Sequence, residues 1–299
     1  MNINRKLVVG MLCCVAAASP IDTVEAGWMD AIVNTINPAQ KMEYPSIKVL
    51  LTHDQESVVL EIKGTYNIYD PRTGQLMSSR FKGKRRNLQA TRQGIVWGEE
   101  FPGVHMLAIV PDDYNTKITV DGIDYFGSMY VYDVGGTISV VNQVLVEDYL
   151  DSLMSPMFRN EMPQELLSAL AITARTNAYY HAGNSKTPYW DVDAGVVGYK
   201  GSLATIPGSP INQAIQHTQF MVLNQNGVND WVQTPFAVQW GAFNIGKIPA
   251  DQPVYSKISI QEAENMANKG ARANAILAKA FPDTTIEIVQ PKPAETAAR

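Results

Sequence analysis

Acidic side chains that can give and take protons occur in two pairs. Glu99 and Glu100 follow Trp97, and two carboxylates beside an aromatic ring can act as a proton donor and a stacking platform for a sugar. Glu147 and Asp148 form the second pair. Each pair also has a structural interpretation. The first fits a turn, and the second fits the start of a helix, where carboxylates favour the positive end of the helix dipole.

Arg175 is the one basic residue in the apolar stretch Leu166–Ala178. An arginine there either contacts a substrate or its catalytic acid, or forms a buried bidentate pair with Glu147 or Asp148. A separate basic cluster either holds anionic polymers or stem-peptide carboxylates, or forms a solvated strand face. Its members are Lys82, Lys84, Arg85 and Arg86.

Aromatic residues are frequent in the second half of the chain and are candidates for stacking on sugars, although core packing explains each of them equally well. They are Tyr179, Tyr180, Tyr189, Trp190, Tyr199 and Trp240.

Several other chemistries are disfavoured. The two cysteines, Cys13 and Cys14, lie in the first 26 residues, and the four histidines are not spaced to share a helix face or a turn. We therefore expect no metal site, no disulfide and no cofactor. The net charge of −5 argues against binding to nucleic acid.

Residues 1–26 have the pattern of a signal peptide. Arg5 and Lys6 precede the apolar run Leu7–Ala18, and Val24-Glu25-Ala26 resembles a cleavage site before Gly27. The run is too short to span a membrane, so we expect export to the periplasm or cell envelope without a transmembrane anchor. A retained N-terminal anchor is the alternative.

The mature chain changes character near residue 141, which predicts an α+β fold. Residues 27–46 fit a short helix and linker. Short β-rich runs punctuated by turns then extend over 47–141 and indicate a mostly antiparallel sheet. Residues 142–289 are helix-rich, and 290–299 fit a disordered tail. A helix over 163–182 carries an apolar stripe, and further helices are expected at 211–222 and 260–280.

Four stretches in the right order resemble the SpoIID/LytB family, named for stage II sporulation protein D and an amidase enhancer. They are Val141–Leu150, Ala169–Thr176, Tyr199–Gly201 continuing into Ile211–Thr218, and Gln239–Ala242 with the helical residues up to Pro282. The resemblance extends over most of 47–289. It implies a β-rich region packed with a helical SpoIID-like core.

The resemblance also implies a function. Founding members of the family are lytic transglycosylases that cut peptidoglycan glycan strands stripped of stem peptides. A glutamic acid protonates the glycosidic oxygen and then takes the proton of the sugar's own 6-hydroxyl group, which leaves a 1,6-anhydro end. Carried over by motif, the catalytic residues are Glu161 and Arg175, and the substrate-binding residues are Tyr179, Tyr199, Lys200, Gln239 and Trp240.

The chain departs from the family where the acid belongs. The family's glutamate stands eighteen residues before the motif arginine, and counting back from Arg175 reaches Met157. Either Glu161 of Glu161-Met162-Pro163 is a displaced acid, or the acid is lost. The metal ligands of some relatives are missing between Trp190 and Gly198, and the glycine-rich loop before Gln239 is absent.

These observations leave three candidate functions. The chain is a divergent lytic transglycosylase, a glycan-binding protein without catalysis, or a structural subunit of an envelope complex with division or secretion proteins as partners. In each of the first two, peptidoglycan glycan strands are the ligand.

Overall fold

The computed structural model describes residues 42–80, 82–203, 206–225, 236–241, 245, 253–289 and 291–293. All of them belong to one compact unit, residues 39–299. The expected signal peptide and nearly all of the expected helix over 27–46 lie outside the described residues. So does most of the expected tail, in which Lys292–Pro293 form a short strand, β19, paired with β1 (Met42–Glu43).

Strands dominate the first half of the described chain. They are β2 (Ser46–Gln55), β3 (Ser57–Lys63), β4 (Tyr66–Asp70), β5 (Gln75–Arg80), β6 (Lys84–Thr91), β7 (Gly94–Trp97), β8 (Glu100–Pro102), β9 (Met106–Pro111), β10 (Lys117–Val120), β11 (Ile123–Tyr125), β12 (Ser128–Val134) and β13 (Thr137–Leu145).

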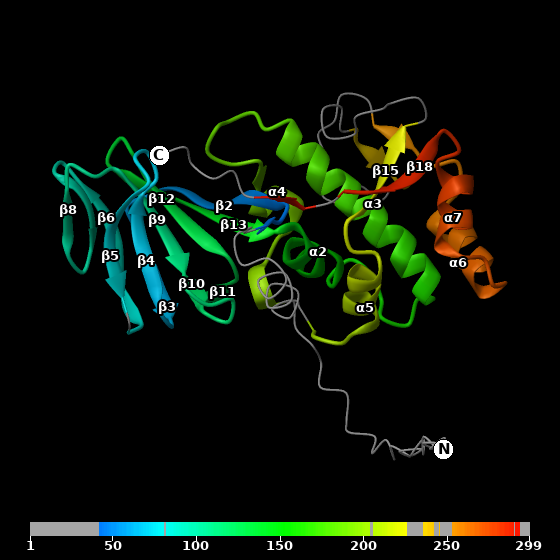
Figure 1. Ribbon diagram of the computed structural model, residues 1–299, viewed down its shortest axis with the longest axis horizontal. Helices are drawn as coiled ribbons and strands as arrows, with labels where there is room; N and C mark the ends of the chain where they lie inside the picture. The colour runs from blue at the N-terminus through cyan, green and yellow to red at the C-terminus, as the bar shows by residue number, and fades with distance from the viewer. Residues whose placement is uncertain are drawn as a thin grey trace, which may run out of the picture. The chain divides into compact units, whose positions relative to one another are not determined.

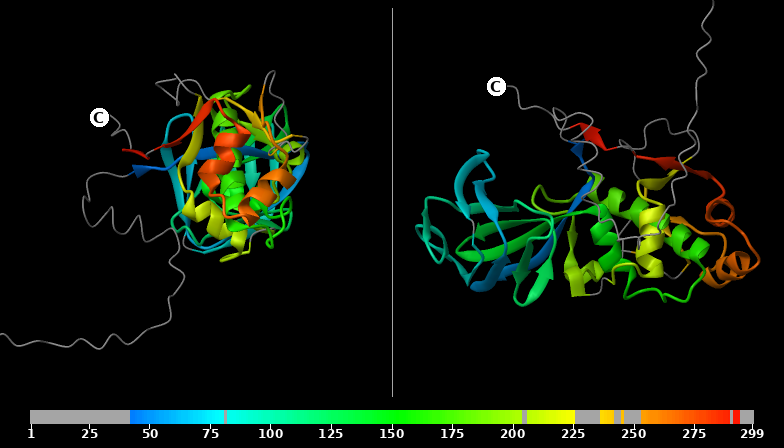
Figure 2. Two further views of the ribbon diagram at one scale, coloured as in Figure 1. Left: turned by 90° about the vertical axis from the view of Figure 1, so that its right-hand side faces the viewer. Right: turned by 60° about the horizontal axis from the view of Figure 1, so that its bottom comes forward.

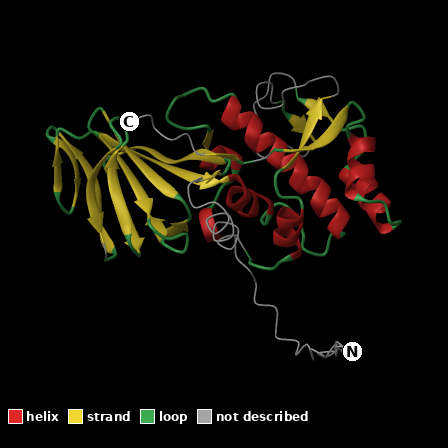
Figure 3. Cartoon of the chain, viewed as in Figure 1, coloured by secondary structure: helices red, strands yellow, loops and turns green. Residues whose placement is uncertain are grey.

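Helices and short strands make up the second half. They are α2 (Val146–Met154), α3 (Gln164–Gly183), β14 (Val192–Asp193), α4 (Ala194–Val197), the 3-10 helix η1 (Gly201–Leu203), α5 (Pro210–His217), β15 (Met221–Gln225), β16 (Val238–Gln239), β17 (Val254–Tyr255), α6 (Ile260–Asn268), α7 (Ala273–Ala280) and β18 (Thr284–Ile288). The predicted α+β class, with an N-terminal antiparallel β region, is confirmed (Figure 3).

Two larger sheets carry the β region. One has the strand order β11-β10-β3-β6-β7-β8, and the other has the order β14-β2-β13-β12-β9-β4-β5. Their pairings are antiparallel, except that β14 runs parallel to β2. The inward faces of both sheets share one apolar core, and the rings of Tyr66 and Trp97 meet across it with centroids 5.8 Å apart.

The seven-stranded sheet also buries part of its other face. Leu50, Tyr132 and Val141 form a second small apolar cluster there, and Trp190 packs against them from the segment after α3. This cluster explains why β13 is buried on both of its faces over Ile138–Asn142. The chain after α3 is therefore tied to the sheet.

The helix α3 is the centre of the second half. Helices α2, α5, α6 and α7 lie around it (Figure 1), and α6 and α7 stand in front of it when the molecule is viewed from their end (Figure 2). Every residue from Leu166 to Ala178 is buried. The predicted helix is confirmed, and every residue of its predicted apolar stripe is buried. The other faces are buried as well, so the helix is enclosed on all sides, which the stripe alone did not indicate.

Two predicted helices end differently from expectation. The helix expected at 211–222 stops at His217, because Phe220 takes a left-handed φ of 64° and Met221–Gln225 pairs with β18 as a strand. The helix expected at 260–280 is two helices. Gly270, with a φ of 88°, ends the first, and its N–H bonds the carbonyl of Ala267.

Candidate functional site

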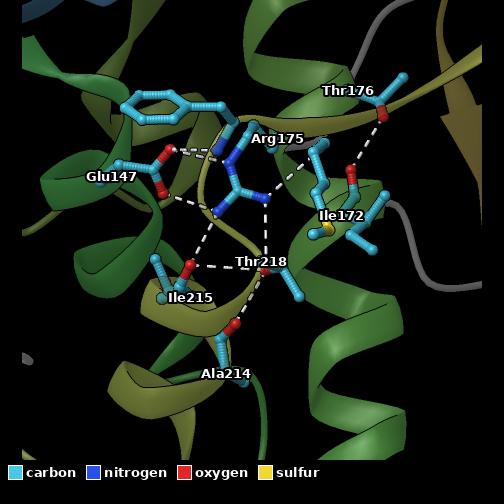
Figure 4. Close-up of polar contacts among 9 residues, drawn as sticks. Glu147, Ile172, Arg175, Thr176, Ala214, Ile215 and Thr218 are labelled. Carbon is cyan, nitrogen blue, oxygen red and sulfur yellow. Dashed lines mark hydrogen bonds and ion pairs between the residues drawn. The ribbon is translucent and has the colours of Figure 1, made fainter. Parts of the chain in front are cut away.

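Arg175 lies at the centre of the helical half, and its side chain is fully buried (Figure 4). Its Nε donates to Glu147 Oε1 at 2.9 Å and its Nη2 to Glu147 Oε2 at 2.6 Å. The remaining N–H groups point to the carbonyls of Ile215 and Met221, both at 3.1 Å, and to the Thr218 hydroxyl at 3.4 Å.

These contacts use every N–H that a guanidinium carries. The bidentate pair joins α3 to the first turn of α2, and the other bonds reach the end of α5 and the start of β15. The interpretation of Arg175 as half of a buried pair with Glu147 is confirmed. Its partner is on a helix and not on the sheet, and the arrangement leaves no donor for a sugar.

The two residues after Arg175 also bind other segments of the chain to α3. Thr176 Oγ1 accepts the N–H of Leu223 at 2.9 Å and donates to the carbonyl of Ile172 at 2.8 Å. The amide of Asn177 bonds the N–H and the carbonyl of Val238 at 2.9 and 3.0 Å. Three polar residues in a row within an apolar helix were the sequence signal for this role.

Glu161 lies far from Arg175 along the same segment. It is exposed, on the turn before α3, and eleven residues of helix separate Gln164 from Arg175, about 16 Å at a rise of ~1.5 Å per residue. Met157 follows α2 and packs, half-buried, against the core. The structure thus does not bring Glu161 and Arg175 together, and the catalytic role of Glu161 stays a prediction.

The Tyr199-Lys200-Gly201 segment packs closely against β11. Tyr199 is buried, donates to Asn142 Oδ1 at 2.8 Å and lies 5.5 Å from the ring of Tyr149. Gly201 has a φ of 58°, and a Cβ there would lie 2.5 Å from the carbonyl oxygen of Asp124, so only glycine fits. Lys200 is exposed and free to meet a ligand.

The remaining predicted binding residues differ in exposure. Trp240 is 1% exposed and packs edge-on against Phe281 with ring centroids 5.4 Å apart. Gln239 is half-buried, and its Nε2 donates to the carbonyl of Gly241 at 2.9 Å. Tyr179 is half-buried against the core, and burial raises the pKa of its hydroxyl. Trp240 is therefore a core residue in this arrangement.

A cavity of about 230 Å³ lies beside α2, and one of its carboxylates, Asp148, was assigned from the sequence to a helix start. Asp148 and Asp151 line it together with Lys117, Phe126 and Tyr199. The hydroxyl of Tyr114 donates to Asp148 Oδ1 at 2.7 Å. Asp151 accepts from Asn212 at 3.0 Å and from Ser155 at 3.1 Å.

Burial changes the acidity of both carboxyl groups in this cavity. The pKa of Asp148 is raised to about 6. Burial is the largest cause, the hydrogen bond from Tyr114 opposes the shift, and the neighbouring carboxylates of Glu147 and Asp151 add to it. Burial also raises the pKa of Asp151, against its bonds from Asn212 and Ser155. Asp148 therefore keeps a proton at a pH where an ordinary aspartate has lost it.

Two of the other acidic and basic candidates, Glu99 and Lys84, have structural partners. Burial raises the pKa of Glu99, but the bonds and charges of Arg80 and Lys84 outweigh it and leave the pKa lowered. Lys84 also stands over the Trp97 ring, with Nζ 4.8 Å from its centroid. Glu100 is exposed on β8.

A second cavity, also of about 230 Å³, lies where α3 ends. It is lined by Tyr180, His181 and Asn184 near the helix end, by Lys186, Thr187, Trp190 and Asp191 of the segment that follows, and by residues of β14 and α4. Two of the aromatic residues picked out from the sequence, Tyr180 and Trp190, thus meet at one hollow.

Two features are absent from the described part of the chain. Within it, His, Cys, Asp and Glu side chains do not gather in groups of three or more that would hold a metal ion. Of the helices described, none combines the length and apolar character needed to cross a membrane.

Comparisons with known proteins agree on one segment. Residues 134–224 match the family model SpoIID, described as stage II sporulation protein. The segment begins at the end of β12 and contains α2, α3, the Arg175–Glu147 pair and the residues from Asp148 to Ser202 around the first cavity. The resemblance expected for the rest of 47–289 stays a prediction.

Relatives extend the comparison beyond that segment. An uncharacterized protein of Chlamydia muridarum is 29% identical over 293 residues, which cover 97% of this chain and 91% of the relative. An uncharacterized protein of Chlamydia pneumoniae is 36% identical over 183 residues, covering 60% and 66%. An uncharacterized protein of Brachyspira hyodysenteriae is 31% identical over 149 residues, covering 49% and 39%.

The family match supports a peptidoglycan-related function, and its position over the central helix agrees with the residues on which the resemblance was based. Residues 134–224 match the stage II sporulation protein family, SpoIID, and this match supports membership of the chain in that family.

Proposed function

We propose that the protein is an exported, cell-envelope protein that remodels peptidoglycan by lytic transglycosylation of glycan strands. The observation that carries the proposal is the cavity beside α2. Asp148, which lies in the segment matched by the SpoIID family model, is a carboxylic acid with a pKa of about 6. It lines the cavity, whose volume is about that of one sugar unit. One protonated, partly enclosed acid is what this reaction requires.

The reaction needs no water and no second carboxylate. The acid gives its proton to the glycosidic oxygen, and the bond from that oxygen to C1 breaks. The resulting carboxylate takes the proton of the sugar's 6-hydroxyl, whose oxygen bonds C1. The products are a 1,6-anhydro end and a free 4-hydroxyl group, and the acid is regenerated. This differs from hydrolysis, in which a second carboxylate attacks or activates water.

Two carboxylates compete for the role of proton donor. Asp148 has the enclosed environment and the raised pKa, whereas Glu161 has the resemblance to the family motif and an exposed position ahead of α3. The distinction is open to measurement, because each can be replaced by its amide with little change in shape.

The test is cleavage of denuded glycan strands by the purified protein, with mass spectrometry of the 1,6-anhydro ends. Asp148→Asn and Glu161→Gln are compared with Glu56→Gln, an exposed carboxylate on the turn before β3. Loss of the donor lowers the rate by about 100-fold or more, whereas the control keeps it. With Asp148 as donor, the rate falls as the pH rises through about 6, because the ionised group has no proton to give.

Absence of anhydro ends from the unmodified protein would exclude cleavage. A second candidate, glycan binding without catalysis, is then favoured. The observation behind it is Met157, a thioether at the position where the resemblance expects the acid. This candidate predicts co-sedimentation with purified sacculi and no change in the strands.

A further inference from the structure

The cavity at the end of α3 continues into a line of aromatic rings. Trp190 lies 6.3 Å from Tyr189, and Tyr189 meets Tyr132 edge-on at 5.1 Å. Tyr132 stacks on Tyr130 at 6.4 Å with the ring planes 12° apart. The first two residues come from the segment after α3 and the other two from β12, so the rings run from the cavity onto the outer face of the seven-stranded sheet.

Part of this line is accessible to a ligand. Tyr189 is 44% exposed, and Trp190 and Tyr130 are half-buried, whereas Tyr132 is buried beneath them. An exposed tyrosine beside a half-buried tryptophan offers flat apolar surface that is already held in place, and such rigid rings lose little conformational entropy when a ligand stacks on them.

The cavity itself combines apolar and polar walls. Val196, which is 50% exposed, lies on α4 and presents an apolar patch. Asn184 and Lys186 also line the cavity, and the amide nitrogen of Asn184 donates to the carbonyl of Tyr180 at 2.9 Å. Asp191 also lines the cavity and is held in position by the backbone N–H of Lys48 at 2.8 Å.

We propose that this cavity and the adjoining rings, called here the α3-end site, bind an N-acetylated sugar unit of a glycan strand. A pyranose ring has an apolar C–H face for Trp190 and hydroxyl edges for Asn184, Lys186 and Asp191. Its N-acetyl methyl group matches the apolar patch at Val196. The rings of Tyr189 and Tyr130 extend the surface for neighbouring units of the same strand.

The charges around the site favour a sugar over a polyanion. Asp191 and Asp193 line the cavity alongside one lysine, Lys186, so a phosphate-rich polymer would meet two carboxylates there. A second cation, Lys48, lies outside the cavity, with Nζ 5.7 Å from the centroid of the Tyr130 ring. The choice of an N-acetylated glycan rests on the proposed peptidoglycan function, but the site is separate from the cavity that holds Asp148. It would serve to hold a strand, whether or not the strand is cut.

The test uses the β-1,4-linked tetrasaccharide of N-acetylglucosamine, followed by NMR of the protein, with the indole N–H of Trp190 assigned through Trp190→Phe. We expect this resonance to shift on titration and Tyr189→Ala to weaken binding roughly tenfold, the loss of one stacked ring. Leu76→Ala is the control. It removes a 50% exposed apolar side chain from β5, at the opposite edge of the same sheet.

The outcomes separate this inference from the proposed function. A tetrasaccharide that leaves the Trp190 resonance unmoved, or that binds Tyr189→Ala as tightly as the unmodified protein, overturns the α3-end site even if strands are cleaved. Binding at Trp190 without any anhydro ends leaves the site standing and removes the transglycosylase. Equal binding of cellotetraose, which lacks N-acetyl groups, contradicts the role given to Val196.

Discussion

The buried guanidinium of Arg175 donates all of its N–H groups to Glu147, Thr218 and two backbone carbonyls. Contact with substrate, one of the two roles considered for this residue, would require one of these bonds to break. Asp148, the neighbour of Glu147 in sequence, was assigned to a helix start. In the structure it lines a cavity, and burial raises its pKa. Sequence position alone does not reveal which of two adjacent acids points to an arginine.

The buried pair gives a stability prediction. Glu147→Gln removes the charge that balances a fully buried guanidinium, so we expect the free energy of unfolding to fall by roughly 3–5 kcal/mol. The measurement is urea denaturation followed by circular dichroism.

Arg159→Ala is the matched control, because the side chain of Arg159 is 70% exposed and pairs with Glu264 at 3.6 Å. It should cost less than about 1 kcal/mol. Equal losses from the two changes would contradict the central place given to the Glu147–Arg175 pair.

Among the site residues, the roles of Tyr199 and Lys200 in substrate binding stay predictions. The glycine that follows them has a structural reason, because the backbone of Asp124 approaches Gly201 too closely for a side chain. Cavities were beyond reach of the sequence, because they depend on residues as distant as Lys117 and Pro207, which only the tertiary fold brings together.

At the scale of elements, α3 is the helix that the others are built around. Three consecutive polar residues, Arg175, Thr176 and Asn177, are buried there and do not face water. Each of them bonds backbone groups of another segment. Thr176 takes the N–H of Leu223 from β15, and Asn177 takes the backbone of Val238 from β16. This is why an apparently interrupted apolar helix can be buried on every side.

Two threonines one turn apart allow this role to be tested. Thr176→Val leaves the buried N–H of Leu223 without its acceptor, and we expect a loss of about 1–3 kcal/mol in the free energy of unfolding. Thr173→Val is the control. Thr173 is equally buried, but its hydroxyl bonds only the Ala169 carbonyl within the same helix.

Calorimetry of the two variants compares these costs. If Thr173→Val proved as damaging as Thr176→Val, the bond to β15 would not be what stabilises the position.

Local sequence patterns predicted the strands but not the residue at which helix α5 ends. The strands were predictable because runs such as Ser57–Lys63 alternate buried and exposed residues. The end of α5 was not, since the residues after it have helical spacing but pair with β18, more than sixty residues later. Long-range pairing overrides local propensity at such places.

At the scale of the whole molecule, the division into a β region and a helical region followed from the change of period near residue 141 and is confirmed. The arrangement of strands into sheets of six and seven was not predictable, because neighbours such as β3 and β6 are paired across intervening strands that belong to the other sheet. Composition could constrain the class of the fold but not this topology.

Export is a property of the whole chain and gives a further prediction. If residues 1–26 are a cleaved signal peptide, the protein recovered from the cell envelope begins at Gly27. Mass spectrometry of its N-terminal peptide is the measurement. Detection of an intact peptide containing Arg5 or Lys6 in that fraction would favour the retained anchor instead.

The pairing of β15 with β18 has a consequence for how the chain matures. Residues 284–288 complete a surface against which α3 is enclosed, and Glu165 at the start of α3 receives the N–H of Ala273 at 2.8 Å. The covering of α3 therefore depends on residues 273–288, which are synthesised well after it. Until they have left the ribosome, the central helix keeps an uncovered face, whereas the two large sheets can already form.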